Sequence, residues 1–355
     1  MEARGAHVAR TVTRPVLVTA ALAALAVATA LCGAAAAAPA GPPRTAAGSA
    51  ATARVQNGLI TFNLDPGTGR TVIKTVRPDG THLRTLVADP TASAESPAWS
   101  HDGRRLVYFR PTDTGCHIIL ARPDGTHRRD LTGSRGGCEA TPTFTPSGRR
   151  ILFVMQRCDS CRTWITSMDL HGRHLHRILR AAPNTGIEDV VLSPDGRRIA
   201  FESGIDPNLQ PFHRAILVAH RDGTHLRTLV RYRFDAGVHF DWSSSGRWLV
   251  YTRWSENPPG HEANVVLVRP DGSREVHLTH VRRAGRAAGG ATFSPDGRQI
   301  VYRFANLDAP HFWLATMHLD GSHKTRIREL AGPPQGTVWA PRVVSSSAPK
   351  TGVQR

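Results

Sequence analysis

The sequence predicts an all-β fold, a six-bladed β-propeller with four antiparallel strands in each blade. Two repeated turns predict it, and so does the division of one repeat between the two ends of the chain. The first turn is clearest in the stretch Ser193 to Phe201, where Pro-Asp-Gly-Arg-Arg lies between apolar residues. Proline, aspartate and glycine in this order suit the bend of a β-hairpin.

The first turn occurs five times at a regular spacing. Its glycines are Gly103, Gly148, Gly196, Gly246 and Gly297. The steps between them are 45, 48, 50 and 51 residues. A period of this length is typical of propellers and other repeat architectures.

A second turn, Asp-Gly-Thr-His in its most regular copies, occurs once in each repeat. Its glycines are Gly80, Gly125, Gly172, Gly223, Gly272 and Gly321, which gives six units. Within the unit around Gly196 we expect four strands, named A to D from the centre outward: 187–192, 197–203, 214–220 and 225–230. These runs are apolar, too short for helices and bounded by turn residues.

The propeller is expected to span residues 54–344. The first unit starts at 56–62 with a B strand but lacks the Trp-Ser-Pro that precedes the other B strands. The missing half stands at the other end, as Val338-Trp339-Ala340-Pro341. Pairing of these two segments is expected to complete a blade and close the ring, which removes exposed sheet edges.

Residues 1–40 are expected to be an export signal peptide. Three arginines precede an apolar run from Pro15 to Leu31, and Ala38-Pro39-Ala40 fits the small-x-small cleavage rule. An uncleaved membrane anchor and a lipoprotein modified at Cys32 are the alternatives. The protein is therefore expected to be secreted or associated with the cell envelope.

Two further segments lie outside the repeats. Residues 41–53 contain Pro, Ala, Gly, Ser and Thr, and are expected to form a flexible linker. Residues 345–355 are expected to be a disordered tail, too short for a catalytic domain. We expect a monomer without a membrane span after signal cleavage.

The two turns together, in Ser193 to Phe201 and Asp222 to Leu229, resemble the WD-repeat-like propeller repeat of the TolB family. The resemblance covers residues 54–344. It implies a propeller of the kind found in periplasmic scaffolds and as an appendage of peptidases and lyases. TolB also has an N-terminal domain that docks a partner, and only 41–53 separates the expected signal from the first blade. The resemblance therefore does not imply a Tol-Pal role.

The chain is strongly basic, with 45 Lys and Arg against 28 Asp and Glu and a net charge of +17. The A–B and C–D turns of a propeller share one face. The A–B turns are expected to place eight arginines on it: Arg104, Arg105, Arg149, Arg150, Arg197, Arg198, Arg247 and Arg298. This face could bind an anionic envelope polymer, lipid headgroups or an acidic protein. Alternatively, each arginine is a solvated turn residue copied with the repeat. Nucleic acid is not expected, because no aromatic residues interleave these arginines.

Acidic residues are expected on the opposite face, around the mouth of the central channel. They are Glu95, Glu139, Glu188, Asp189, Asp235 and Asp241, at or before the A strands. A ring of carboxylates could hold a cation or a cationic peptide. Alternatively, the carboxylates bond to backbone N–H groups or arginines between blades.

Histidines stand in the B–C loops on that same face: His117, His213, His261 and His311. They belong to different blades, so no shared metal site is predicted. No metal and no cofactor are expected.

The expected mature chain has four cysteines, Cys116, Cys138, Cys158 and Cys161. An even number in an exported protein favours disulfides, and the preferred pairing is Cys116–Cys138 with Cys158–Cys161. The Cys-x-x-Cys spacing also occurs in redox and zinc motifs. No βαβ pattern and no second such pair accompany it here.

The sequence contains no Gly-x-Ser-x-Gly, His-Glu-x-x-His or phosphate-loop motif. The predicted function is therefore a non-enzymatic binding or scaffold module for a protein or an anionic cell-envelope polymer. Two alternatives stay open. One is a lyase or hydrolase with histidine and carboxylate groups, with or without a metal, at the channel mouth. The other is a sensor of a sugar or another small molecule.

Overall fold

The computed structural model describes residues 54–112, 115–133, 137–157, 162–182, 185–206, 213–232, 239–254, 262–283, 285–306, 308–309 and 311–344. Every regular element in these ranges is a β-strand, which agrees with the all-β prediction. No helix able to cross a membrane occurs in this part of the chain. The expected signal peptide, linker and C-terminal tail (1–40, 41–53 and 345–355) lie outside the described residues.

The first two sheets contain four and eight strands. The first has the spatial order β24 (Gln335–Val344), β1 (Arg54–Leu64), β2 (Val72–Val76) and β3 (Arg84–Val87). The second has the order β11 (His176–Arg180), β10 (Arg162–Asp169), β9 (Arg150–Arg157), β8 (Gly137–Phe144), β6 (Gly115–Ala121), β5 (Leu106–Thr112) and β4 (Glu95–Trp99), with β7 (Arg129–Asp130) paired to β6.

The other two sheets again contain four and eight strands. The third has the order β12 (Ile187–Leu192), β13 (Arg198–Asp206), β14 (His213–His220) and β15 (Arg227–Tyr232). The fourth has the order β16 (Phe240–Trp242), β17 (Leu249–Trp254), β18 (Ala263–Val268), β20 (Arg286–Phe293), β21 (Gln299–Asn306), β22 (His311–His318) and β23 (Thr325–Leu330), with β19 (Glu275–His277) paired to β18.

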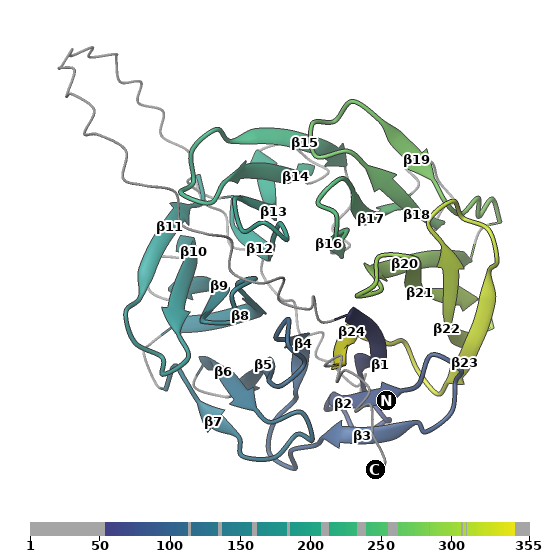
Figure 1. Ribbon diagram of the computed structural model, residues 1–355, viewed down its shortest axis with the longest axis horizontal. Helices are drawn as coiled ribbons and strands as arrows, with labels where there is room; N and C mark the ends of the chain where they lie inside the picture. Colours follow the sequence, from purple (N-terminus) through teal and green to yellow (C-terminus); the bar gives the residue numbers. More distant parts are fainter. Residues whose placement is uncertain are drawn as a thin grey trace, which may run out of the picture. The chain divides into compact units, whose positions relative to one another are not determined.

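The sheets are arranged like propeller blades around a common centre, with β4, β8, β12, β16, β20 and β24 innermost (Figure 1). Each eight-stranded sheet is held together at its middle by one parallel pair. Cys116↔Cys138 joins β6 to β8, and Ala263↔Ala287 joins β18 to β20. All other strand pairs are antiparallel, as expected for consecutive hairpins.

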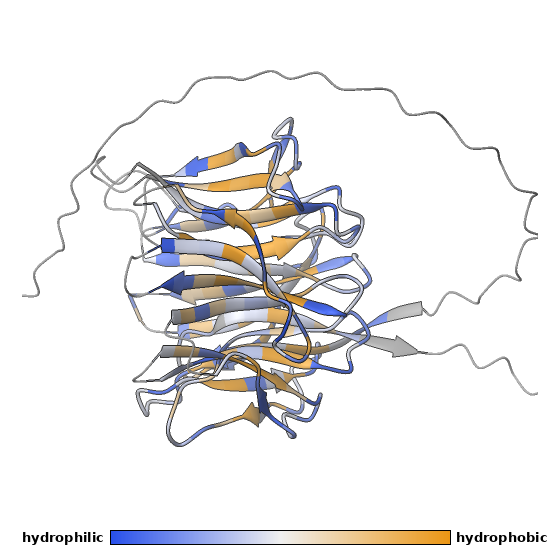
Figure 2. Ribbon diagram, turned by 90° about the vertical axis from the view of Figure 1, so that its left-hand side faces the viewer, coloured by the Kyte–Doolittle hydropathy of each residue, from blue (hydrophilic) through white to orange (hydrophobic). Residues whose placement is uncertain are grey.

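The hydrophobic core lies between neighbouring sheets, because strand side chains alternate and both faces are covered. In β9, Ile151 and Phe153 belong to a buried cluster shared with β5 and β6. Leu152 and Val154 belong to another cluster, shared with β12 and β13. Hydropathy follows the same plan, with apolar residues along the strands and polar residues at the strand ends and turns (Figure 2).

The first and last strands pair with each other. β1 and β24 are antiparallel, with a register that runs from Arg54↔Val344 to Asn63↔Gln335. Residues of β1 and β2 also share one buried cluster with Val301 of β21 and Leu314 of β22. The two ends of the described chain therefore belong to one sheet, as the split repeat predicts.

Two positions in the second turn require glycine both because φ is positive there and because a neighbouring backbone lies too close for a side chain. Gly125 has a φ of 80°, and a Cβ there would lie 2.2 Å from the carbonyl oxygen of Leu86 in the preceding sheet. Gly80 has a φ of 81° and meets the carbonyl oxygen of Ile327 at the same distance, 2.2 Å. Any side chain at these positions would push neighbouring sheets apart.

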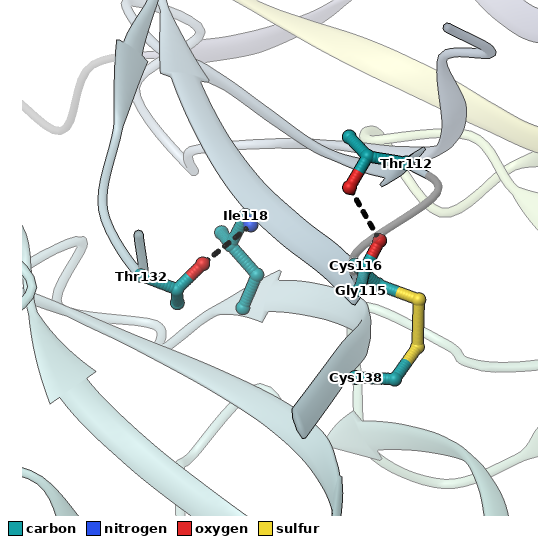
Figure 3. The surroundings of a disulfide bond; sticks show 6 residues. All are labelled: Thr112, Gly115, Cys116, Ile118, Thr132 and Cys138. Atoms are coloured by element: carbon teal, nitrogen blue, oxygen red, sulfur yellow. Dashed lines mark hydrogen bonds between the residues drawn. A yellow bond between two sulfur atoms is a disulfide. The ribbon is translucent and has the colours of Figure 1, made fainter. Parts of the chain in front are cut away.

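The structure contains the disulfide Cys116–Cys138, at the parallel pair that joins β6 to β8 (Figure 3). Close to it, the Ile118 N–H donates to Thr132 Oγ1 at 3.0 Å. The disulfide is the first of the two pairings expected from the sequence. Cys158 and Cys161 lie outside the described residues, so their pairing stays a prediction.

The tryptophans of the repeated motif bond differently to the preceding sheet. Trp99 Nε1 donates to Thr61 Oγ1 at 3.0 Å. Trp242 Nε1 is buried and has no partner among the described residues. Ala200, which directly precedes the B-strand phenylalanine as Thr61 does, packs in the cluster of Trp242 and offers no acceptor.

We expect Thr61→Val to lower the free energy of unfolding by about 1–2 kcal/mol, because it leaves the indole N–H of the half-buried Trp99 without its acceptor. Ala200→Ser should raise this free energy by about 1 kcal/mol through a new bond from Trp242. Urea unfolding followed by tryptophan fluorescence measures both. Ala219→Ser, at a buried position in an apolar cluster, is the control and should destabilise. Equal destabilisation at positions 200 and 219 would contradict the account.

Replacing Cys116 and Cys138 by alanine should cost about 3 kcal/mol, because the bridge closes a loop with a sequence separation of 22 residues. Thermal and urea unfolding measure the loss. A reductant added to the double variant then reports on Cys158 and Cys161 alone. An unchanged unfolding midpoint would show that the bridge does not constrain the chain.

Candidate functional site

The predicted acidic residues that the structure describes differ in burial and in bonding partners. Glu95 is half-buried, accepts a hydrogen bond from Thr71 Oγ1 at 3.3 Å, and burial raises its pKa. Glu139 is buried, with 2% of the residue exposed. Glu188 is half-exposed and forms a salt bridge with Arg214. Asp235 lies outside the described residues.

Asp241 connects two neighbouring strands. Its Oδ2 accepts hydrogen bonds from Thr292 Oγ1 at 2.6 Å and from the Phe293 N–H at 3.0 Å, both in β20. Its Oδ1 accepts from the Trp242 N–H at 2.8 Å. Burial raises the pKa of Asp241 despite these bonds. This carboxylate therefore matches the structural alternative, in which acidic residues bond to backbone N–H groups within the protein.

Asp189 instead faces a histidine that sequence reasoning missed. His239 lies just before β16, with Nδ1 3.9 Å from Asp189 Oδ2. The Gly336 N–H of β24 donates to His239 Nε2 at 3.3 Å, so the imidazole proton stands on Nδ1, facing Asp189. Burial and the charges of Glu202 and Asp241 raise the pKa of Asp189 to about 7. Burial and Arg303 lower the pKa of His239.

A second polar network lies beside this pair in the third sheet. Arg214 Nη1 lies 3.2 Å from Glu202 Oε1, and the Tyr232 hydroxyl donates to the same oxygen. Burial, followed by the charge of Glu202, raises the pKa of Tyr232. Since Arg214 also pairs with Glu188, these carboxylates are engaged within the protein.

The B–C histidines stay apart. His117 Nδ1 bonds Asp130 Oδ2 at 2.5 Å in the second sheet. His311 Nδ1 bonds Glu329 Oε1 at 2.6 Å in the fourth. The side chain of His213 and all of His261 lie outside the described positions. Within the described chain, no three His, Cys, Asp or Glu side chains gather as a metal site.

The eight predicted arginines divide into two groups by strand alternation. The first group takes the position directly after the turn glycine and is exposed, without a side-chain hydrogen bond or salt bridge among the described residues. Its members are Arg104, Arg149, Arg197, Arg247 and Arg298. The second group takes the next position and bonds to backbone carbonyls. Its members are Arg105, Arg150 and Arg198.

Arg150 departs from the pattern of its group. Arg105 reaches Gly148 O in the next turn at 3.5 Å, and Arg198 reaches Gly246 O at 3.3 Å. Arg150 turns back instead, and donates to His174 O at 2.7 Å. Arg150 lines a groove of about 1100 Å³ between β9–β11 and the turns that follow β12 and β14.

The groove is lined largely by basic and imidazole side chains. These include Arg150, Arg197, Arg198, Arg221, His176 and His220. Arg198 also lies over the Trp242 ring, 4.9 Å from its centroid, which fixes its orientation. The groove thus brings four arginines from two neighbouring repeats together.

A smaller cavity of about 280 Å³ lies between the inner strands. The last residues of five of these strands line it, Trp99, Phe144, Leu192, Trp242 and Phe293, together with Trp339 of β24. These are the apolar residues that precede each turn in the repeat. Their position follows from the repeat itself, so these residues reflect the fold and do not indicate a binding site.

Comparison of the sequence with known protein families identifies the family of this chain. A family model described as the TolB beta propeller domain matches residues 67–343. The chain belongs to this TolB propeller family. TolB from Acinetobacter baumannii is 22% identical, with a TM-score of 0.61 over 80% of this chain and 66% of that one. A putative TolB from Agrobacterium tumefaciens is 17% identical, with a TM-score of 0.59 over 82% and 99%.

Other propellers share the fold of this TolB-family chain. An oligogalacturonate lyase from Vibrio parahaemolyticus is 12% identical, with a TM-score of 0.52 over 79% of this chain and 75% of that one. At these identities the likeness shows the fold alone. No curated protein matches the sequence.

We expect Asp189→Asn to stabilise the protein increasingly as the pH rises from about 4 to about 7. The folded protein raises the pKa of this carboxyl from 3.8 to about 7, so it keeps a proton that the unfolded chain releases. Wild-type stability therefore falls as the pH rises between these two pKa values, by about 1.4 kcal/mol for each pH unit. Asparagine does not ionise and avoids this loss.

Urea unfolding at a series of pH values measures the difference between Asp189→Asn and wild type. Asp195→Asn is the control of opposite sign, since the hydrogen bond from Ser193 lowers the pKa of Asp195. That variant should lose stability relative to wild type as the pH rises through about 4. A difference at Asp189 that does not change with pH would contradict the assigned environment.

Proposed function

We propose that residues 54–344 form a closed ring of six blades. Support comes from the two parallel pairs, because dividing each eight-stranded sheet there leaves six sets of four strands. The pairing of β1 with β24 supports closure. So does the contact of Gly80 with Ile327, since it brings the first set against the last.

In this proposal the protein is a non-enzymatic binding module that takes an anionic polymer of the cell envelope on its turn face. One observation carries it: five turns of the repeat present five exposed arginines without hydrogen-bonded partners among the described residues. Charges of one sign on one face attract a polymer of the other sign and raise its association rate. The groove beside Arg150 adds a concave site to this face.

The carboxylates at the predicted channel mouth support the enzyme alternative less than the arginines support binding, because several of them are already bonded within the protein. Asp241 is bonded to backbone N–H groups, and Glu188 and Glu202 are paired with Arg214. Residues 1–40 are proposed as the export signal. The Cys116–Cys138 bridge fits an oxidising compartment.

The test compares two triple variants of equal charge. Arg149, Arg197 and Arg247 are changed to Gln on the turn face, and Arg180, Arg231 and Arg282 at the opposite strand ends form the control. All six are exposed. Binding of a fluorescent polyglutamate is measured by anisotropy at several salt concentrations.

The turn-face variant should bind at least about tenfold more weakly at low salt and respond less to added salt, because exposed charges are screened within about 10 Å at 0.1 M. The control variant should bind within about twofold of wild type, since its charges lie far from the ligand. Equal losses in the two variants would mean that net charge alone attracts the polymer. Salt-independent binding would contradict an arginine-face site.

A further inference from the structure

The turn face also carries two exposed leucines. Leu175 is 45% exposed and Leu226 is 52% exposed, and no other large hydrophobic residue of the described chain is exposed. Each follows a histidine in the left-handed region, His174 with a φ of 52° and His225 with a φ of 54°. The two leucines therefore occupy the same turn position in neighbouring repeats.

The other repeats cover or replace this position. Leu83 packs against the buried cluster between the first and last sheets. Arg128 replaces leucine and donates to Gly125 O at 2.9 Å, and Lys324 donates to Gly321 O. The exposure of Leu175 and Leu226 is thus a departure from the repeat, and it occurs in the two repeats that border the groove.

The groove between these repeats is suited to a phosphate group. Four arginines line it, Arg150, Arg197, Arg198 and Arg221. Its two aspartates are occupied by their own turns, since Asp195 accepts from Ser193 Oγ and Asp222 from Thr224 Oγ1, both within 2.7 Å. Arginine matches phosphate oxygens through its planar set of donors.

We propose that this face docks on a bilayer that contains anionic phospholipids. Leu175 and Leu226 enter the headgroup region, and the groove beside Arg150 takes a lipid phosphate. The inference rests on the proposed anion binding by the turn face and names its partner. Exposed apolar side chains next to arginines are the combination by which peripheral proteins hold anionic membranes.

The direction of the chain agrees with this orientation. Gly103, in an A–B turn, lies against the carbonyl oxygen of Pro341 in β24. The Asp296 N–H, in another A–B turn, donates to Asn57 Oδ1 of β1 at 3.2 Å. The start of β1 therefore stands on the turn face, so the chain enters the domain from the side that is proposed to meet the bilayer.

The test measures flotation of the full chain with lipid vesicles. One set contains phosphatidylcholine alone, and the other contains roughly one third phosphatidylglycerol, enough for a negative surface potential. Leu175→Ser with Leu226→Ser is compared with Leu175→Met and Leu226→Met, which keep the apolar character. The run from Pro15 to Leu31 is identical in all variants, so differences report on the domain.

Wild type and the methionine variant should float with the anionic vesicles. The serine variant should bind them at least about tenfold more weakly while it binds polyglutamate as wild type does. Equal binding of the serine variant to vesicles, or equal binding of wild type to both vesicle sets, would overturn the inference. Polyglutamate binding without vesicle binding would overturn it and leave the proposed function intact. If wild type binds neither polyglutamate nor anionic vesicles, the proposed function and this inference are both contradicted.

Discussion

The packing of turn glycines on the backbone of the preceding sheet is the constraint on which the rest of the structure depends. A Cβ at Gly125 would lie 2.2 Å from Leu86 O, and one at Gly103 would lie 2.3 Å from Pro341 O. Because the turns of one repeat rest on the sheet before it, the sheets take a fixed spacing and all these turns end on one face. The exposed arginines follow the glycines of the A–B turns, which stand at the same strand ends as the C–D turns and therefore on the same face.

Function is best sought where single repeats depart from this plan. Arg150 donates to His174 O and not to the neighbouring turn glycine, and it lines the groove. Leu175 and Leu226 stay uncovered where other repeats have a buried leucine or a basic residue. At the other end of the central strands, Asp189 and His239 bring a carboxyl and an imidazole within 3.9 Å. Arg150 lines the groove, the two leucines belong to the repeats on either side of it, and the Asp189–His239 pair links β12 to the residue before β16.

The repeat made much of the fold predictable, because turn residues and short apolar runs depend on local sequence. Strand 187–192, the pairing of 56–62 with the C-terminal segment, and the Cys116–Cys138 bridge could all be read from the repeat and its numbering. The site was less predictable. His239 meets Gly336 across a sequence separation of 97 residues, which no local pattern reveals. Arg149 and Arg150 look alike in sequence, and only strand alternation separates the exposed side chain from the bonded one. The larger His239, at a place where the other repeats have Ser96, Thr141, Asp189, Gly290 and Gly336, was the available signal.

The central claim is that an anionic ligand binds the turn face and not the channel mouth. Hydrogen exchange of the full chain, with and without a saturating anionic polymer, tests it most directly, because it locates the contact without any substitution. We expect slower exchange in the turns at 147–150 and 195–198, and unchanged exchange at 187–190 and 239–241. Slower exchange confined to the segments that carry Asp189 and His239 would contradict the claim and move the binding site to the central channel.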